Sequence, residues 1–283
     1  MYILRTGDAP PHRLTRRVAR CPGTTRGACD DARMPALVAP LLTLAIGGLL
    51  VLTAVAGSGA LLAGVIGAQI VLAYALIAAD EHADISRDGV LVAIAVAAGA
   101  VALAVEDNPH GLTPSLGPVA YVVGPAVLLA LMLRLLRSAR REHLVEAFAT
   151  TVTGVALVGM LAALIALRSV NDGDRIVVLT VTCATLAALP GLASWTTRPE
   201  WAWWVGRFVG VLLAATFAVV DIVGLDPSTR YSVGAAATIA GVLGAEVAVR
   251  FTSARASAAA LVPTVAVALA APPAYVLARV LLG

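Results

Sequence analysis

Four charged residues lie within or at the edge of long apolar runs, where a charge is costly and is by default a sign of function. Glu146 begins one run, Arg207 lies early in another, and Glu246 and Arg250 close a third. The planar guanidinium of arginine binds phosphate oxygens in pairs. These four residues are therefore a candidate site for an anionic lipid headgroup or a phosphate.

Two plainer explanations stay open for the same residues. Glu246 and Arg250 are four residues apart, so they can form an intrahelical pair that lowers the cost of both charges. Glu146 can be an acid favoured by the dipole at a helix N-terminus. Asp221 lies in the same run as Arg207, but about 21 Å of helix rise separates the two, which excludes a direct pair.

An acidic loop follows the second apolar run and could hold a metal ion. It carries Asp80, Glu81, Asp84 and Asp88, whose oxygens are of the kind that Mg²⁺ prefers. A charge run in a loop is more often simply solvated, and the chain has no Walker motif, HExxH or GxSxG. We therefore expect no catalytic residue, no metal site and no cofactor.

The composition indicates a chain that is solvated mainly by lipid. Of 283 residues, 60% are hydrophobic and 13% are charged, whereas soluble domains carry about 25% charged residues. All 20 basic residues are arginine, and with the abundant alanine, valine and leucine this points to a GC-rich bacterial genome. The net charge of +3 lies in loops, so a nucleic-acid partner is not expected. The three cysteines have neither a metal-ligand spacing nor the pattern of a disulfide framework.

Nine apolar runs are each near the ~20 residues that cross a bilayer. They are residues 35–56, 59–79, 89–105, 115–133, 145–167, 176–195, 203–224, 231–250 and 257–281. A chain in lipid must satisfy its backbone polar groups internally, so each run should be helical. The sequence predicts an all-α, polytopic integral membrane protein with about nine transmembrane helices. Residues 1–34 are polar and rich in arginine, and we expect a disordered tail before a transmembrane domain at 35–283.

The arginines predict the orientation, because arginines in short loops stay on the cytoplasmic side. The loop at residues 134–143, RLLRSARREH, holds four of them. With the N-terminus inside, 16 of the 20 arginines are cytoplasmic, and without residues 1–33 the ratio is still nine to four. We predict an N-in, C-out protein of the bacterial inner membrane. The four arginines on the outer side would be Arg168, Arg175, Arg230 and Arg279.

Some runs carry packing signals. A stripe of small residues in the eighth run should permit close helix contact; it consists of Ala236, Ala240, Gly244 and Ala248. Pro190 should disturb the sixth run, and Pro263 and Pro272-Pro273 the ninth. Broken helices can mark transport sites, so a small permease is an alternative function, although the halves show no clear internal repeat. A purely structural membrane subunit is another.

Three stretches carry a resemblance to a known family. They are residues 149–182, VGRFVG at 205–210 and AAPPAYVLARVLLG at 270–283. With the nine runs and the tight turn at residues 57–59, the chain from 35 to 283 resembles the bacterial phosphatidate cytidylyltransferase (CDP-diacylglycerol synthase) family. That family uses CTP and Mg²⁺ to place a cytidylyl group on phosphatidic acid, with aspartates that hold the metals.

The chain departs from the family's pattern at the residues that matter. It has no lysine, and Gly244-Ala245-Glu246 stands where the family's Gly-Asp-Leu would begin. The resemblance therefore assigns no catalytic residue here, and Mg²⁺ is implied only if the family's activity is retained. We expect an inactive relative whose partners are membrane lipids or another membrane protein.

Overall fold

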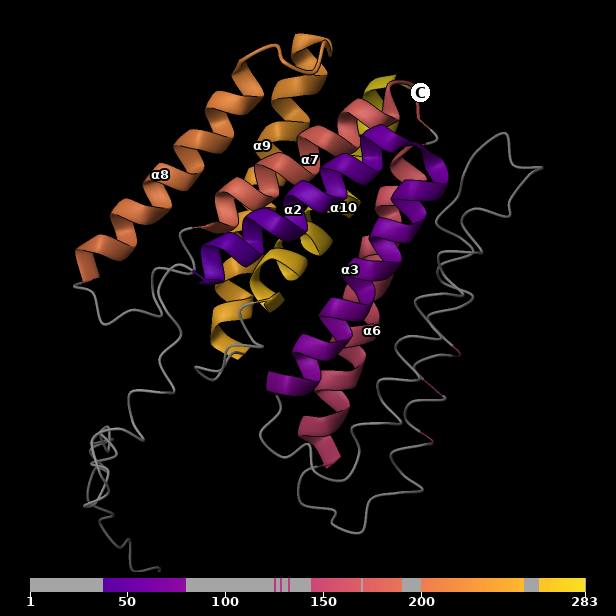
Figure 1. Ribbon diagram of the computed structural model, residues 1–283, viewed down its shortest axis with the longest axis vertical. Helices are drawn as coiled ribbons and strands as arrows, with labels where there is room; N and C mark the ends of the chain where they lie inside the picture. Colours follow the sequence, from indigo (N-terminus) through magenta and orange to yellow (C-terminus); the bar gives the residue numbers. More distant parts are fainter. Residues whose placement is uncertain are drawn as a thin grey trace, which may run out of the picture. The chain divides into compact units, whose positions relative to one another are not determined.

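The computed structural model describes residues 38–79, 144–168, 170–189, 200–251 and 260–282, with three single positions between 125 and 132. Within these ranges the chain is all-helical and contains no strand (Figure 1). The helices are α2 (Val38–Ala56), α3 (Ser58–Ala79), α6 (Leu144–Arg168), α7 (Gly173–Ala188), α8 (Glu200–Val219), α9 (Pro227–Phe251) and α10 (Leu261–Leu282).

Seven of the nine predicted runs coincide with these helices, which confirms the all-α prediction over the described part of the chain. The predicted runs at 89–105 and 115–133 lie outside the described residues, apart from those single positions. The tail at 1–34, the acidic loop and the arginine loop at 134–143 also lie outside them. Two runs are displaced toward the C-terminus relative to their helices. Helix α7 spans Gly173–Ala188 where the prediction was 176–195, and α8 spans Glu200–Val219 where the prediction was 203–224.

Among the described residues, three helices are long and apolar enough to cross a membrane, which fits a membrane protein. The segments are Ser58–Leu76, Pro227–Val249 and Leu261–Leu282. Shorter apolar helices span Pro40–Ala56, Val152–Arg168 and Trp204–Val219. Many large apolar side chains are exposed on the helices, as expected of a surface solvated by lipid.

Consecutive helices are antiparallel, so that three turns gather at one end of the bundle, here called the hairpin end (Figure 1). It carries the turns at Gly57, 170–172 and 220–226 together with Leu282. Side chains link these turns. Arg168 donates to the Ala54 carbonyl at 3.4 Å, and Asn171 donates to the Leu282 carbonyl at 3.5 Å. Arg175 donates to the Gly224 carbonyl at 3.2 Å and to the Asp172 carboxylate at 3.1 Å.

Glycine determines two of these turns. Gly57 alone separates α2 from α3, and its φ of 136° is one that a residue with a side chain rarely adopts. A Cβ on Gly173, at the start of α7, would lie 2.4 Å from the Leu167 carbonyl oxygen. The chain can therefore reverse within a few residues at both places.

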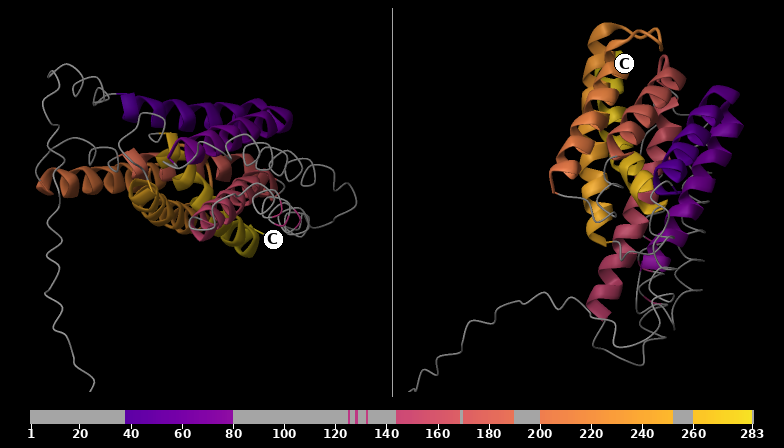
Figure 2. Two further views of the ribbon diagram at one scale, coloured as in Figure 1. Left: turned by 90° about the horizontal axis from the view of Figure 1, so that it is seen from below. Right: turned by 60° about the vertical axis from the view of Figure 1, so that its left-hand side comes forward.

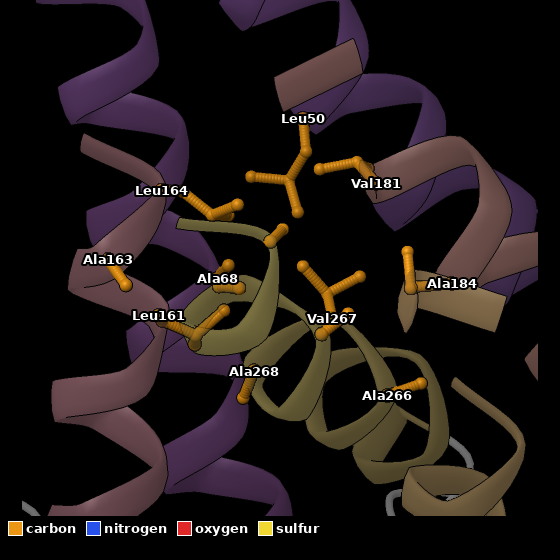
Figure 3. Packing of buried hydrophobic residues seen from close by; sticks show 14 of the residues in the cluster. Leu50, Ala68, Leu161, Ala163, Leu164, Val181, Ala184, Ala266, Val267 and Ala268 are labelled. Atoms are coloured by element: carbon orange, nitrogen blue, oxygen red, sulfur yellow. The ribbon is translucent and has the colours of Figure 1, made fainter. Parts of the chain in front are cut away.

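Helix α10 is the core of the bundle. It packs against α9, α6, α7, α3 and α2, and residues 261–268 are buried on every side (Figures 2 and 3). The prolines that were predicted to disturb this run do not break its helix, because α10 continues through Pro272 and Pro273. Pro263 lies in the first turn, where backbone N–H groups have no intrahelical partner. The prediction for the sixth run fits better, since α7 ends two residues before Pro190.

Helix α9 makes its closest contacts through glycine. A Cβ on Gly244 would lie 2.6 Å from the Ala266 Cα on α10, and one on Gly241 would lie 2.8 Å from the Ala184 carbonyl oxygen on α7. The predicted stripe is thus partly correct: Gly244 and Ala248 are buried, whereas Ala236 and Ala240 are half-buried. The outward stripe of α9 is apolar and exposed; it contains Tyr231, Ile239, Leu243 and Val247.

Candidate functional site

Helix α8 lies at the edge of the bundle beside α7 and α9 (Figure 1). It contacts them through small residues spaced four apart, with Gly210, Ala214 and Ala218 buried and Gly206 half-buried. The buried thiol of Cys183 on α7 approaches the Ala214 carbonyl, with an Sγ–O distance of 3.6 Å. The remaining face of α8 is bulky, apolar and exposed, so the helix is attached along one narrow line.

Arg207 is the charged residue on this line, and it forms an ion pair with Glu246 on α9. The guanidinium Nη2 donates to Oε2 of the carboxylate. The two side chains are 19% and 31% exposed, so both are partly buried and both can still be reached from outside. Arg207 lies near the start of α8 and Glu246 near the end of α9, which places the pair away from the hairpin end.

The other two candidate residues are placed by their backbone alone. Arg250 lies one turn beyond Glu246 on α9, and its side chain is outside the described part of the structure. Glu146 lies near the start of α6, which packs against α10, α3 and α7, while α8 packs against α7 and α9. Figure 1 shows α6 and α8 on opposite sides of the bundle. The structure thus brings Arg207 and Glu246 together, whereas the helix that carries Glu146 lies on the other side of the bundle.

A second ion pair, at the hairpin end, joins the turn after α8 to the start of α9. Arg230 Nη1 lies 2.6 Å from Oδ1 of Asp221, and the arginine side chain is 7% exposed whereas the aspartate is 62% exposed. The guanidinium also lies over the Tyr231 ring, 5.3 Å from its centroid. Asp226 caps the start of α9: the Ser228 backbone N–H and hydroxyl donate to its carboxylate and lower its pKa. The α8–α9 hairpin is therefore fixed at its turn.

Sequence reasoning treated Asp221 and Arg230 separately and missed their pairing. In an antiparallel hairpin, contacting residues are equally distant from the turn. Arg207 and Glu246 meet this condition, and so do Asp221 and Arg230, since both pairs are centred near Asp226. The Gly206, Gly210, Ala214 and Ala218 spacing was also readable from the sequence as a small-residue stripe.

The described residues contain no group of three or more His, Cys, Asp or Glu side chains that could hold a metal ion. The acidic loop at residues 80–88, a candidate for Mg²⁺ binding in the sequence, lies outside these residues. What the site offers is a guanidinium and a carboxylate at one end of a lipid-facing hairpin. The guanidinium of such a pair can bind an external anion in place of the carboxylate.

Comparisons with known proteins give no family for the chain. No family model matches the sequence, and neither curated proteins nor solved structures provide a match.

Proposed function

We propose that the chain is a multi-pass protein of a bacterial inner membrane, with nine spans, a cytoplasmic N-terminus and an outer C-terminus. The alternation of the described helices supports this proposal. Helix α3 ends and α6 begins at the same end of the bundle (Figure 1), which agrees with an even number of crossings, zero included, by the chain between them. Two crossings, at 89–105 and 115–133, would give nine in total.

A reporter fusion at Gly283 is expected to score as non-cytoplasmic, and one in the 134–143 loop as cytoplasmic. The reason is the excess of arginines on the side away from the hairpin end. Each position is fused to two reporter enzymes, one active only in the cytoplasm and one active only outside it. Their activities show on which side of the membrane the position lies. A fusion at Gly283 that scores as cytoplasmic would contradict the nine-span topology.

We propose further that the protein binds anionic membrane lipid at the cytoplasmic end of α8 and α9 and is not an enzyme. The observation that supports this most directly is the Arg207–Glu246 pair, partly exposed beside a broad apolar face. Arg250, one turn further along α9, is a second arginine of the predicted site. Binding of a membrane-protein partner on this surface, transport and a purely structural role are the alternatives.

Mass spectrometry of lipids that copurify with the protein tests the proposed binding. The wild type should be enriched in anionic phospholipid over the bulk membrane, and the Arg207→Gln/Arg250→Gln double variant should lose that enrichment. Thermal melting of both proteins controls for folding. A lipid composition equal to that of the bulk membrane in the wild type would contradict the proposal and favour the permease or structural alternatives.

The resemblance to the phosphatidate cytidylyltransferase family is retained as a proposal about origin. Phosphoryl transfer depends on metal ions and cationic groups that stabilise charge at the reacting phosphates. The chain has no lysine, and Gly244-Ala245-Glu246 stands where the family's Gly-Asp-Leu would begin, so that an alanine takes the place of the family's aspartate. We propose that the family's chemistry has been lost.

The purified protein is accordingly expected to produce no CDP-diacylglycerol from CTP, Mg²⁺ and phosphatidic acid. The measurement is radiolabelled product formation beside an active cytidylyltransferase as a positive control. Mg²⁺-dependent turnover that Glu246→Gln abolishes, and that Asp221→Asn leaves intact, would contradict this expectation.

A further inference from the structure

Arg207 differs in position from the arginines at the hairpin end, two of which also pair with carboxylates, Arg175 with Asp172 and Arg230 with Asp221. Arg168 and Arg175 bind backbone carbonyls, Arg230 pairs with an aspartate of the same turn, and Arg279 donates to the Tyr275 hydroxyl at 3.0 Å. These contacts tie the turns and helix ends together. Arg207 lies at the other end of the bundle and reaches across to a side-chain carboxylate on a neighbouring helix.

The surroundings of Arg207 open onto the apolar surface. Trp204 and Phe208, which flank it on α8, are 65% and 70% exposed. Aromatic residues at the start of a membrane helix mark the interface where lipid headgroups lie. A phosphate group of a lipid packed against this face of α8 therefore lies at the depth of the Arg207 guanidinium.

We infer that Arg207 is the phosphate-binding group and that Glu246 is its internal competitor, which holds the guanidinium when no lipid phosphate is bound. This inference rests on the proposed lipid binding. A carboxylate and a phosphodiester accept hydrogen bonds from the same guanidinium N–H groups, so each weakens the binding of the other. A lipid phosphate can reach the guanidinium without displacing a helix, because both side chains of the pair are partly exposed.

The consequence is that removal of the acid should strengthen anion binding. Glu246→Gln removes the competing charge and retains Arg207, so phosphatidylglycerol should bind about threefold to tenfold more tightly. Arg207→Gln should weaken binding about tenfold or more. Arg207→Lys keeps the charge but not the planar fork and should lie between the wild type and Arg207→Gln.

The experiment measures binding of a fluorescent phosphatidylglycerol to the full chain in nanodiscs of phosphatidylcholine. Arg279→Gln is the matched control, since Arg279 lies at the hairpin end and its variant should bind as the wild type does. Thermal melting of each variant shows whether it is folded. If Glu246→Gln is unstable, Glu246→Asp, whose shorter side chain withdraws the carboxylate, should also raise the affinity.

A second arm distinguishes a lipid headgroup from a free phosphate. If the site takes the headgroup, inorganic phosphate at millimolar concentration should leave the bound phosphatidylglycerol in place; if it takes free phosphate, the lipid should be displaced. Both outcomes keep Arg207 as the anion-binding group. Unchanged or weaker binding by folded Glu246→Gln, while the wild type retains phosphatidylglycerol, would overturn the inference. A wild type that binds no phosphatidylglycerol would overturn the proposed function itself.

Discussion

Replacement of Gly244 by alanine is expected to lower the free energy of unfolding by about 1–3 kcal/mol. The added methyl group would lie 2.6 Å from the Cα and 2.9 Å from the backbone nitrogen of Ala266, and 3.0 Å from the Val265 carbonyl oxygen. These are backbone atoms of α10, which is buried and cannot move aside as a flexible side chain could. The two helices would have to separate, with loss of contacts along their shared length.

Gly48 on α2 provides the matched control. It is also a glycine within an apolar helix, but a Cβ there would meet no atom within 4 Å. Gly48→Ala should therefore be neutral or raise the free energy of unfolding by up to about 1 kcal/mol, because alanine is the better helix former. Denaturation of the three proteins in the same detergent measures the difference. Equal stability of Gly48→Ala and Gly244→Ala would show that α9 and α10 do not pack at this distance.

These two glycines show which part of the fold the sequence could predict. Hydropathy located the described helices, because a segment that is surrounded by lipid must consist mostly of apolar residues along its whole length. It did not reveal which helix each run would contact, since lipid-facing and protein-facing surfaces are both apolar. The small-residue stripe marked Gly244 as a site of close helix contact, but only the structure shows that its neighbour is Ala266 and that Gly48 has none within 4 Å.

The same limit applies to the charged residues. The sequence predicts the membrane depth of a charged residue from its position within its apolar run. This depth placed Arg207 and Glu246 at the same end of the bundle. Their contact depended on α8 and α9 being neighbours, which the short turn at 220–226 could have indicated. Glu146 has a similar depth, yet its helix lies on the other side of the bundle, so depth alone is not sufficient to define a site (Figure 1).

The Arg207–Glu246 contact should contribute measurably to stability, beyond any role in lipid binding. Arg207→Ala leaves a partly buried carboxylate without this partner, and the expected loss is about 1–3 kcal/mol in the free energy of unfolding. A double-mutant cycle with Glu246→Gln isolates the interaction. The losses of unfolding free energy in the two single variants should add up to more than the loss in the double variant. The exchanged pair Arg207→Glu/Glu246→Arg should recover part of the stability, since it restores opposite charges on the same two helices.

The pair between Asp172 and Arg175 is the control for this cycle. It has the same kinds of charged groups, but both side chains are about half exposed, at 50% and 49%, and they belong to one turn. Water screens such a pair, so its coupling should be about 0–1 kcal/mol. The two cycles are measured by unfolding in detergent without added lipid, and the coupling between Arg207 and Glu246 should be clearly the larger. Equal coupling in both cycles would mean that the α8–α9 pair is solvated as freely as a surface ion pair and does not hold α8 to the bundle.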